Sequence, residues 1–336
     1  GSSIVREPVG VVGAITPFNF PFMLNVVKVA PALAAGCTIV LKPHPWTPLD
    51  AMMIAEASVE AGLPPGVLNV VVGHAEVGET IVNSRLVDLI TMTGSTATGR
   101  RIMQAGAETI KRIHLELGGK SAQIILDDVS EDYVRSIGFG GVLTHCGQGC
   151  AIQTRLLMPH HLLDAYLDGV KAAQPLIKVG DPNDPSTVLG PLIREQQRQR
   201  VEGLVASGIE QGAKVVCGAK RPAGLDKGFY YEPTVLIGEN HMRIAQEEIF
   251  GPVMTVIPYS DLDEAVRIAN DSDYGLAAMI VGSNSLTAVE VGKRLRTGSV
   301  WINQGGNMAY GPFGGFKLSG LGREGGAFGM HEFTEM

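Results

Sequence analysis

The 336-residue chain is rich in glycine and mildly acidic. Its 43 glycines make up nearly twice the usual glycine share of about 7%, and 45% of its residues are hydrophobic. With 27 Lys and Arg against 34 Asp and Glu, the net charge is −7 at pH 7, so we expect no nucleic-acid partner. These figures exclude a disordered chain, a collagen and a disulfide scaffold, and the length favours two domains.

Strands and helices alternate in the first third of the chain. Short β-branched runs bounded by Gly or Pro predict strands in VGVVGAITP, CTIVLKP, VLNVVVG and VDLITMTG. Apolar residues at helical spacing predict helices over 49–60 and 98–107. Strands that follow one another with helices between them form parallel sheets with helices on both faces, and such buried strands need no polar alternation.

A second α/β set follows Gly118 and Gly119. Its predicted strands lie in SAQIILDD, RLLMP, FYYEPTVLIG, PVMTVIPYS, LAAMIVG and SVWIN. Its predicted helices cover 132–143, 161–173, 194–208 and 262–270. The tail from Gly305 has many glycines and no periodicity, which in a compact enzyme more often shapes a site than a core.

An apolar run at 22–41 is long enough to span a membrane. Asn25, Lys28 and Pro31 interrupt it, and an ammonium at mid-bilayer would cost several kcal/mol, so we expect a buried segment of a soluble domain. The start, GSSIVREPVG, has no signal-peptide pattern. Four cysteines at irregular spacing fit reduced thiols, and together these features predict a cytoplasmic protein without a membrane partner.

The GQGC segment carries a candidate nucleophile, Cys150. Backbone N–H groups beside the flanking glycines can lower the pKa of its thiol and hold an oxyanion. Most free cysteines are instead small buried hydrophobes, which is our expectation for Cys37 and Cys217. Cys146 and His145 lie close by, but Cys-x3-Cys beside one His is poor zinc spacing, so we expect no metal.

Two further polar residues follow apolar strands. Glu116, in LELGGK, ends a strand at a Gly-Gly turn and is a candidate general base, with a salt-bridged strand-end Glu as an equal alternative. Asn19, in TPFNFP, lies in a rigid turn and is a candidate oxyanion donor. A turn Asn that satisfies its own backbone is the commoner explanation when nothing else is known.

Two segments have features of a nucleotide site. TGSTATG follows a strand and opens a helix, and glycines and hydroxyls at a helix N-terminus can bind phosphate, although the motif is weak alone. Lys42 ends the strand CTIVL, at the edge of the sheet where nucleotides bind in open α/β folds.

Taken in order, TPFNFP, VLKP, TGSTATG, LELGGK, GQGC, EEIFGPV and PFGGFKLSG resemble the NAD(P)-dependent aldehyde dehydrogenase superfamily. The resemblance covers essentially all 336 residues, and so many ordered motifs make a chance match negligible. It implies an α/β fold with a Rossmann-like cofactor domain plus a catalytic domain. It also implies the hydrolytic, non-acylating oxidation of an aldehyde.

The resemblance implies a role for each candidate catalytic residue. Cys150 would attack the aldehyde carbon, with the oxyanion held by the Asn19 amide and the Cys150 backbone N–H. Loss of hydride would leave a thioester, and Glu116 would activate the water that hydrolyses it. Lys28 and Glu324 resemble a proton path behind this base.

The same resemblance implies an NAD or NADP site. Lys42 would contact the adenosine ribose, Gly94 to Gly99 would lie near the pyrophosphate, and Glu248 would contact the nicotinamide ribose. The implied set is Ile15, Thr16, Phe18, Lys42, Gly78, Gly94, Ser95, Gly99, Leu117, Gly118, Glu248 and Phe250.

Two departures from the family pattern carry predictions. Relatives that prefer NAD often have KPxE, whereas this chain reads KPHPW with Pro45 in place of the Glu. Because that carboxylate would repel a 2′-phosphate, we expect NADP to be tolerated. Cys146, in LTHCGQGC, could form a reversible disulfide with Cys150 under oxidation.

The chain also looks shortened beside the family. Relatives carry more of the cofactor domain before TPFNFP and a further strand after the final FTE. We expect the end of an oligomerisation arm over 1–8, a cofactor domain over 9–118, a catalytic domain over 119–319 and a returning segment over 320–336. Full-length relatives are dimers or tetramers, so we expect a homodimer or homotetramer.

Two other functions remain open from the sequence. One is a CoA-acylating semialdehyde dehydrogenase, which commonly lacks the Glu at position 116. The other is a non-catalytic protein that reuses the fold. For the enzyme, Phe18, Phe20, Phe22, Met23 and Leu24 would line part of the entry funnel by analogy, which suggests apolar or aromatic aldehydes.

Overall fold

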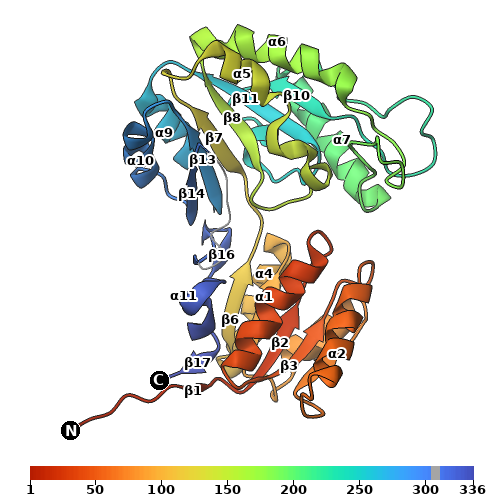
Figure 1. Cartoon of the computed structure of the whole chain (residues 1–336), viewed down its shortest axis with the longest axis vertical. Helices are drawn as coiled ribbons and strands as arrows, with labels where there is room; N and C mark the ends of the chain where they lie inside the picture. Colours follow the sequence, from red (N-terminus) through yellow and green to blue (C-terminus); the bar gives the residue numbers. More distant parts are fainter. Residues whose placement is uncertain (304–310) are drawn as a thin grey trace. The chain divides into compact units, whose positions relative to one another are not determined.

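The computed structural model describes residues 1–303 and 311–336, and the chain divides into two compact units (Figure 1). The first contains residues 1–118 and 307–336, and the second contains residues 119–306. The division falls between Gly118 and Gly119, where the sequence changes character. The chain re-enters the first unit at 307, earlier than the expected boundary between 319 and 320, so the predicted domain limits stay a proposal at that end.

A sheet forms the centre of the first unit. Among the described residues its strand order is β16 (Gly320–Leu321), β6 (Arg112–Glu116), β5 (Leu89–Thr93), β2 (Val11–Ile15), β3 (Thr38–Lys42) and β4 (Leu68–Val70). All neighbours pair in parallel except β16, which is antiparallel to β6. Every residue of β5 is buried, which explains its continuous apolar and Thr composition.

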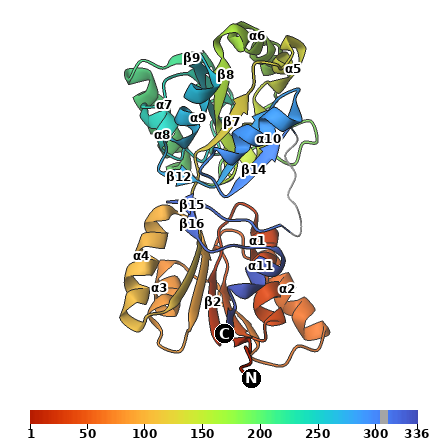
Figure 2. The same cartoon turned by 90° about the vertical axis from the view of Figure 1, so that its left-hand side faces the viewer.

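Helices cover both faces of this sheet, as Figure 2 shows. One face carries α1 (Pro21–Ala34), α2 (Leu49–Glu60) and α11 (Gly326–His331), and the other carries α3 (Ala75–Asn83) and α4 (Thr96–Gly106). Val12, Ala14, Ile39 and Leu41 pack under α1, and Ile90 and Met92 pack under α3 and α4. Helices on both faces of a parallel sheet form the architecture expected from the alternating elements.

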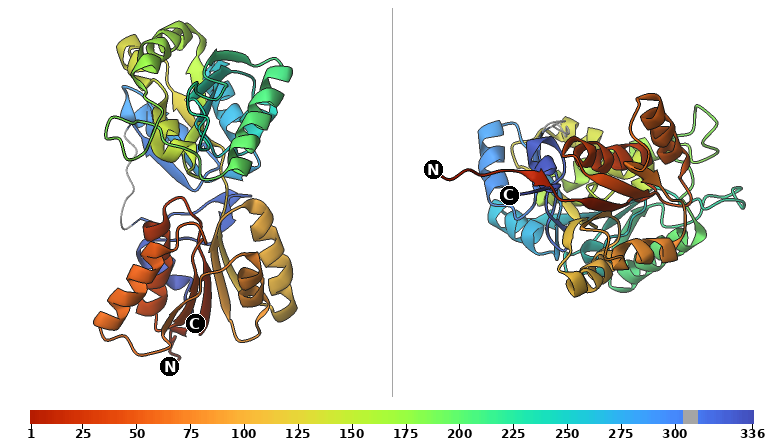
Figure 3. Two further views of the ribbon diagram at one scale, coloured as in Figure 1. Left: turned by 90° about the vertical axis from the view of Figure 1, so that its right-hand side faces the viewer. Right: turned by 90° about the horizontal axis from the view of Figure 1, so that it is seen from below.

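The two ends of the described chain meet in the first unit. Strand β1 (Glu7–Pro8) pairs antiparallel with β17 (Thr334–Glu335), and both ends of the chain lie at this unit in Figure 3. Arg112 donates a hydrogen bond to the Thr334 carbonyl at 2.7 Å and contacts the Glu335 carboxylate at 2.9 Å. The last residues of the chain therefore pair with its first strand, and Arg112 joins them to β6 of the six-stranded sheet.

The second unit has its own twisted sheet. Its order, among the described residues, is β14 (Ser299–Ile302), β13 (Ala277–Val281), β7 (Ser121–Ile125), β8 (Gln153–Pro159), β11 (Val253–Tyr259), β10 (Thr234–Ile237) and β9 (Lys214–Cys217). The strands run parallel except β9, which is antiparallel to β10. The short strand β12 (Tyr274–Gly275) also belongs to this unit, whereas β15 (Phe316–Lys317) belongs to the first.

In the described part of the second unit, helices pack on its sheet or beside it. Helices α5 (Glu131–Ile137) and α6 (Leu163–Ala173) cover one face through Val134, Tyr166 and Val170. Helices α9 (Leu262–Asn270) and α10 (Ser285–Lys293) cover the other face through Ala265, Val266, Ala288 and Val291. Helix α7 (Glu195–Glu210) and the short α8 (Arg243–Gln246) pack together around Val201, Leu204 and Ile244.

Several predicted elements differ from the observed ones. The helix predicted over 132–143 ends at Ile137, because Gly138 and Gly140 both have φ of +52°, and a 3₁₀ segment then runs over Gly140–Gly147. The apolar run 22–41 is divided between α1 and β3, and no helix in the described part of the chain has the length and apolarity to cross a membrane. Helices α1, α3, α8, α10 and α11 were not predicted from the sequence.

The contact between α5 and α6 generates a stability prediction. A Cβ at Gly169 of α6 would lie 2.1 Å from the Arg135 carbonyl oxygen, whereas a Cβ at Gly203 of α7 would meet nothing within 4 Å. We expect Gly169→Ala to lower the free energy of unfolding by about 1–3 kcal/mol through overpacking. Gly203→Ala should raise it by about 0.5–1 kcal/mol, because alanine favours the helix. Urea unfolding measures both, and an unchanged Gly169→Ala protein would contradict this packing.

Candidate active site

The loop before Cys150 has an unusual backbone that its surroundings hold in place. His145 and Cys146 have φ of +47° and +56°, and Gly147 has φ of +70°. A Cβ at Gly147 would lie only 1.9 Å from the Gly251 carbonyl oxygen, so only glycine fits there. Strained conformations of this kind persist where packing over-determines them, and they cluster at functional sites.

Gln148 locks the same loop with its side chain. Its Oε1 accepts a hydrogen bond from the Ile193 N–H at 3.1 Å, and its Nε2 donates to the His145 carbonyl at 3.1 Å. The side chain is buried. The Gln of the GQGC motif therefore fixes the loop that presents Cys150.

Cys150 is the least buried of the four cysteines. It is half-buried, whereas Cys37, Cys146 and Cys217 are buried, and none of the four forms a disulfide. Its backbone packs on Gly119, since a Cβ there would lie 2.4 Å from the Cys150 carbonyl oxygen. Because Gly119 belongs to LELGGK, two sequence motifs meet at the candidate nucleophile.

Cys146 has a structural environment. Its Sγ donates to the Gly190 carbonyl at 3.3 Å, and burial raises the pKa of the thiol. It packs with Leu189, Leu192 and other apolar residues of one core cluster. This environment favours a resting thiol, so the disulfide with Cys150 stays a prediction.

Glu248 joins the same cluster of motifs through Gly119. Its Oε1 accepts a hydrogen bond from the Gly119 N–H at 3.0 Å. Burial raises the pKa of Glu248 to about 7, against the opposing effects of the Gly119 N–H, Arg200 and Lys120. Phe250, two residues on, has φ of +59°, and its carbonyl accepts from Gln197 Nε2 at 2.7 Å. Glu248 and Cys150 thus flank the same glycine.

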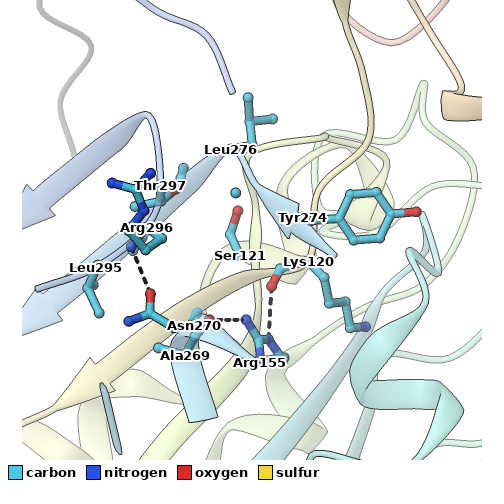
Figure 4. Close-up of a pocket in the computed structure, with 14 residues that line it drawn as sticks. Lys120, Ser121, Arg155, Ala269, Asn270, Tyr274, Leu276, Leu295, Arg296 and Thr297 are labelled. Atoms are coloured by element: carbon cyan, nitrogen blue, oxygen red, sulfur yellow. Dashed lines mark hydrogen bonds between the residues drawn. The ribbon is translucent and has the colours of Figure 1, made fainter. Parts of the chain in front are cut away.

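Lys120 is a buried cation that sequence reasoning missed. No described residue accepts a hydrogen bond from its Nζ, and burial, followed by the charge of Arg155, lowers its pKa to about 7 while Glu248 opposes the change. Figure 4 shows the Arg155 guanidinium against the Lys120 backbone, where Nε donates to the Lys120 carbonyl at 2.9 Å. The available signal was a lysine placed between a Gly-Gly turn and the predicted strand in SAQIILDD.

Glu116 lies in the first unit, at the end of β6. Its side chain is 2% exposed, and neither carboxyl oxygen has a hydrogen-bond partner among the described residues. Burial raises the pKa of Glu116 well above its usual range; Glu324 adds to this, and Lys28 and Arg323 oppose it. A buried carboxyl with a raised pKa and unused lone pairs has the properties of a general base.

The C-terminal segment brings Glu324 and Arg323 to this base. Strand β16 pairs with β6, and the Leu117 N–H donates to the Ser319 carbonyl at 2.8 Å. Glu324 Oε1 then lies 2.5 Å from Lys28 Nζ, and both groups are buried. The structure therefore places the pair that resembled a proton path in the same unit as Glu116.

The predicted residues near Asn19 lie between β2 and α1. Asn19 is buried in the turn, and Thr16 Oγ1 donates to Asn25 Oδ1 of α1 at 2.6 Å. The Phe18 ring meets the His44 ring edge to face at 5.4 Å. Ile15 is the last residue of β2, so this turn follows the strand directly.

The remaining predicted cofactor residues of this unit occupy the carboxyl edge of the sheet. Lys42 ends β3, its Nζ donates to the Pro43 carbonyl at 3.3 Å, and burial lowers its pKa. A Cβ at Gly78 of α3 would lie 3.6 Å from Lys42 Cδ. Ser95 caps α4 by accepting the Thr98 N–H at 3.2 Å, just after Gly94.

Gly99 permits the close packing of α4. A Cβ there would lie 2.8 Å from the Leu117 side chain, and Leu117 and Gly118 follow β6 directly. The capped helix N-terminus beside the end of β5 fits a pyrophosphate, and the lysine at the end of β3 fits a ribose hydroxyl. The residues present therefore fit a dinucleotide.

The described contacts sort the predicted residues into two groups. Cys150, Glu248 and Phe250 belong to the second unit, and all the others belong to the first. Among the residues that the structure describes, no three His, Cys, Asp or Glu side chains are grouped as metal ligands. Part of the glycine-rich tail, 304–310, lies outside the described residues.

Comparison with known proteins places these motifs in context. The model of the aldehyde dehydrogenase family matches residues 1–336. A curated Staphylococcus aureus relative, whose name places it among the aldehyde dehydrogenases, is 44% identical over 99% of this chain and 71% of its own length. The chain thus spans about 71% of the length of that relative.

Solved structures give the same result. A Mycobacterium tuberculosis aldehyde dehydrogenase in complex with NAD+ is 48% identical, with a TM-score of 0.95 over 98% of this chain and 68% of that one. An aldehyde dehydrogenase C variant of Pseudomonas syringae, in complex with NAD+ and octanal, is 44% identical with a TM-score of 0.95 over 98% and 69%. A Staphylococcus aureus betaine aldehyde dehydrogenase with NAD+ is 38% identical, with a TM-score of 0.95 over 98% and 67%.

The exposure of Cys150 predicts selective alkylation. Iodoacetamide should modify Cys150 at least about tenfold faster than the three buried thiols, because burial hinders access and raises the pKa of Cys146 and Cys217. Peptide mass spectrometry measures each site, with Cys150→Ser as the control that should label slowly overall. Equal rates at all four cysteines in the folded protein would contradict the arrangement of the loop.

Proposed function

The chain belongs to the aldehyde dehydrogenase family, and on that premise we propose that it oxidises an aldehyde to a carboxylic acid with NAD+ or NADP+. The observation that supports it best is the pair of groups the reaction needs. These are a half-buried cysteine in a rigid loop, Cys150, and a buried carboxyl without a hydrogen-bond partner among the described residues, Glu116. Packing alone requires neither.

The first half of the reaction uses the thiol. The Cys150 thiolate attacks the carbonyl carbon of the aldehyde, so that a C–S bond forms and the carbonyl oxygen takes the negative charge. The Asn19 amide and the Cys150 backbone N–H donate hydrogen bonds to this oxygen in the proposed mechanism. When bound, NAD(P)+ accepts the hydride that leaves the same carbon, and a thioester on Cys150 remains.

The second half uses Glu116. Its carboxylate takes a proton from water, whose oxygen attacks the thioester carbon; the C–S bond breaks, and the thiolate and the carboxylic acid are released. The unused lone pairs of Glu116 suit this role. Because the pKa of Glu116 is raised, hydrolysis should slow as the pH falls through that value and the base becomes protonated.

The proposed cofactor contacts use residues of both units. Lys42 and Glu248 would hold the two riboses, and the N-terminus of α4 with Gly94 and Ser95 would hold the pyrophosphate. Ile15, Thr16, Phe18, Gly78, Gly99, Leu117, Gly118 and Phe250 complete the proposed surface.

The alternatives are weaker on specific grounds. A CoA-acylating enzyme transfers the acyl group from cysteine to the CoA thiol and has no need of a base that activates water. Here Glu116 is buried without a hydrogen-bond partner among the described residues, as suits such a base. A non-catalytic protein has no need of an accessible Cys150 in a strained loop.

The substrate proposal is an apolar aldehyde. Phe22 and Met23, at the start of α1, are 58% and 49% exposed, and the Pseudomonas syringae relative was solved with octanal. Leu24, which was expected beside them, is buried in α1, since it follows the helix onto its core-facing side, and we leave it out. A cytoplasmic location, a homodimer or homotetramer and an oligomerisation arm over 1–8 remain proposals from the resemblance.

Two substitutions test the mechanism. Cys150→Ser should abolish turnover by at least about a thousandfold, because the nucleophile is lost. Glu116→Gln should still form one equivalent of NADH per site in a burst and then stop, because the thioester persists. Stopped-flow absorbance and intact mass measure both steps. Steady turnover by the Glu116→Gln protein at the wild-type rate would contradict the assigned base.

The missing carboxylate at position 45 predicts cofactor tolerance. The wild-type chain should turn over with NADP+ as well as NAD+, and Pro45→Glu should lower kcat/KM for NADP+ about tenfold relative to NAD+, because a carboxylate repels the 2′-phosphate. Steady-state kinetics with both cofactors measure the ratio, with Pro45→Gln as the uncharged control. No measurable NADP+ turnover in the wild-type chain would contradict this prediction.

A further inference from the structure

A row of buried polar side chains lies on one face of strands β5 and β6. In the parallel register Thr91 pairs with His114 and Thr93 pairs with Glu116. Residues two apart on a strand point to the same face, so His114 and Glu116 share one face of β6. Polar residues in the centre of a buried sheet are expensive unless they are used, and the reaction proposed above uses only Glu116.

Hydrogen bonds join this row to the ion pair beside the base. Lys28 Nζ lies 2.5 Å from Glu324 Oε1 and donates to Thr91 Oγ1 at 3.2 Å. Thr91 Oγ1 lies 2.9 Å from His114 Nδ1. Lys28 and Thr91 have no exposed surface, and His114 is 1% exposed. The four groups form a continuous buried chain from Glu324 to His114.

The chemistry of each group sets the direction of these bonds. An ammonium only donates, so Thr91 Oγ1 must accept from Lys28. The Thr91 hydroxyl keeps its single proton, which it can donate to His114 Nδ1 when the imidazole carries its proton on Nε2. Burial, with help from the charges of Lys28 and Arg323, lowers the pKa of His114 to about 3, so the imidazole is neutral at physiological pH.

We propose that Thr91 and His114 are positioning residues that hold the Lys28 ammonium beside Glu324, and that they thereby set the charge environment of Glu116. The inference rests on the proposed role of Glu116 as the base and adds two residues to which the motifs assign no part. His114 fixes the Thr91 hydroxyl, and the hydroxyl fixes the ammonium.

The charges around Glu116 give the direction of the effect. Glu324 from the C-terminal segment raises its pKa, whereas Lys28 from α1 and Arg323 from the C-terminal segment lower it; His114 on β6 is neutral. If Lys28 loses its acceptor at Thr91, its ammonium is held less well and offsets Glu324 less. An ammonium that is held less well stabilises the Glu116 carboxylate less, and it leaves the charge of Glu324 less compensated. Both effects raise the pKa of Glu116, so they reinforce each other.

A packing role for His114 is the competing explanation. Its ring lies against Gly322, where a Cβ would come within 2.3 Å of His114 Cδ2. Shape alone would let leucine, which has a similar volume, replace the imidazole. Asparagine is smaller but offers Oδ1 near the position of Nδ1, so it restores the acceptor without restoring the shape. The two substitutions therefore separate hydrogen bonding from packing.

The test follows the Glu116 carboxyl directly in the resting protein. Its protonated C=O band is identified by infrared difference spectroscopy as the band that Glu116→Gln removes, and its titration midpoint is measured. Thr91→Val and His114→Leu should move the midpoint upward by about half a pH unit or more, and His114→Asn should leave it near the wild-type value. Thr255→Val is the matched control, because it also removes a buried threonine hydroxyl, which donates to the Ile244 carbonyl.

Each outcome decides the inference. An upward shift in Thr91→Val and His114→Leu, with His114→Asn and Thr255→Val unmoved, supports it. Midpoints that do not move, or that move equally in His114→Asn and His114→Leu, overturn it in favour of packing. If Thr91→Val fails to fold, the His114 pair carries the same test. Because the band is read without substrate, a shifted midpoint in a protein that hydrolyses no acyl-enzyme would instead refute the proposed function.

Discussion

The burial of Glu116 is the constraint on which much of the first unit depends. A carboxyl with no hydrogen-bond partner among the described residues is costly in a protein interior, and the raised pKa of Glu116 expresses that cost. The unit tolerates it by placing cations nearby: Lys28 reaches in from α1, and Arg323 arrives with the C-terminal segment. The antiparallel pairing of β16 with β6 holds that segment in place. The end of the chain therefore completes the environment of Glu116.

The second unit holds Cys150 half-buried in a rigid loop. It does so with backbone contacts that no larger residue permits. Gly119 packs on the Cys150 carbonyl, and Gly147 packs on the Gly251 carbonyl. The Gln148 side chain then closes the loop with two hydrogen bonds. Such approaches explain much of the glycine content, because each needs either a missing Cβ or a left-handed backbone.

The first unit places its candidate groups where parallel strands end, whereas Gly119, Cys150 and Glu248 of the second unit each precede a strand. Lys42, Glu116 and the turn with Asn19 follow strands of the first sheet, and Gly119 begins the connection into the second. Helices on both faces keep the strands rigid, while the residues beyond the carboxyl ends are free of ladder hydrogen bonds and can vary. Within the second unit, Arg155 of β8 donates a hydrogen bond to the carbonyl of the buried Lys120, just before β7.

The sequence by itself determined the alternating α/β architecture and the residues that the motifs contain. Cys150, Glu116 and the family could be identified because their signals are local: glycines, strand ends and short ordered patterns. The helix predicted over 132–143 failed because apolar spacing continues past Gly138 and Gly140, whose left-handed backbone ends it. Tertiary structure alone decided the rest. His114 and Thr91 face each other only through the register of β5 and β6, Glu324 meets Lys28 from the far end of the chain, and Lys120 is exceptional only because it is buried. Burial and pairing set the energies of these groups, and neither can be read from local sequence.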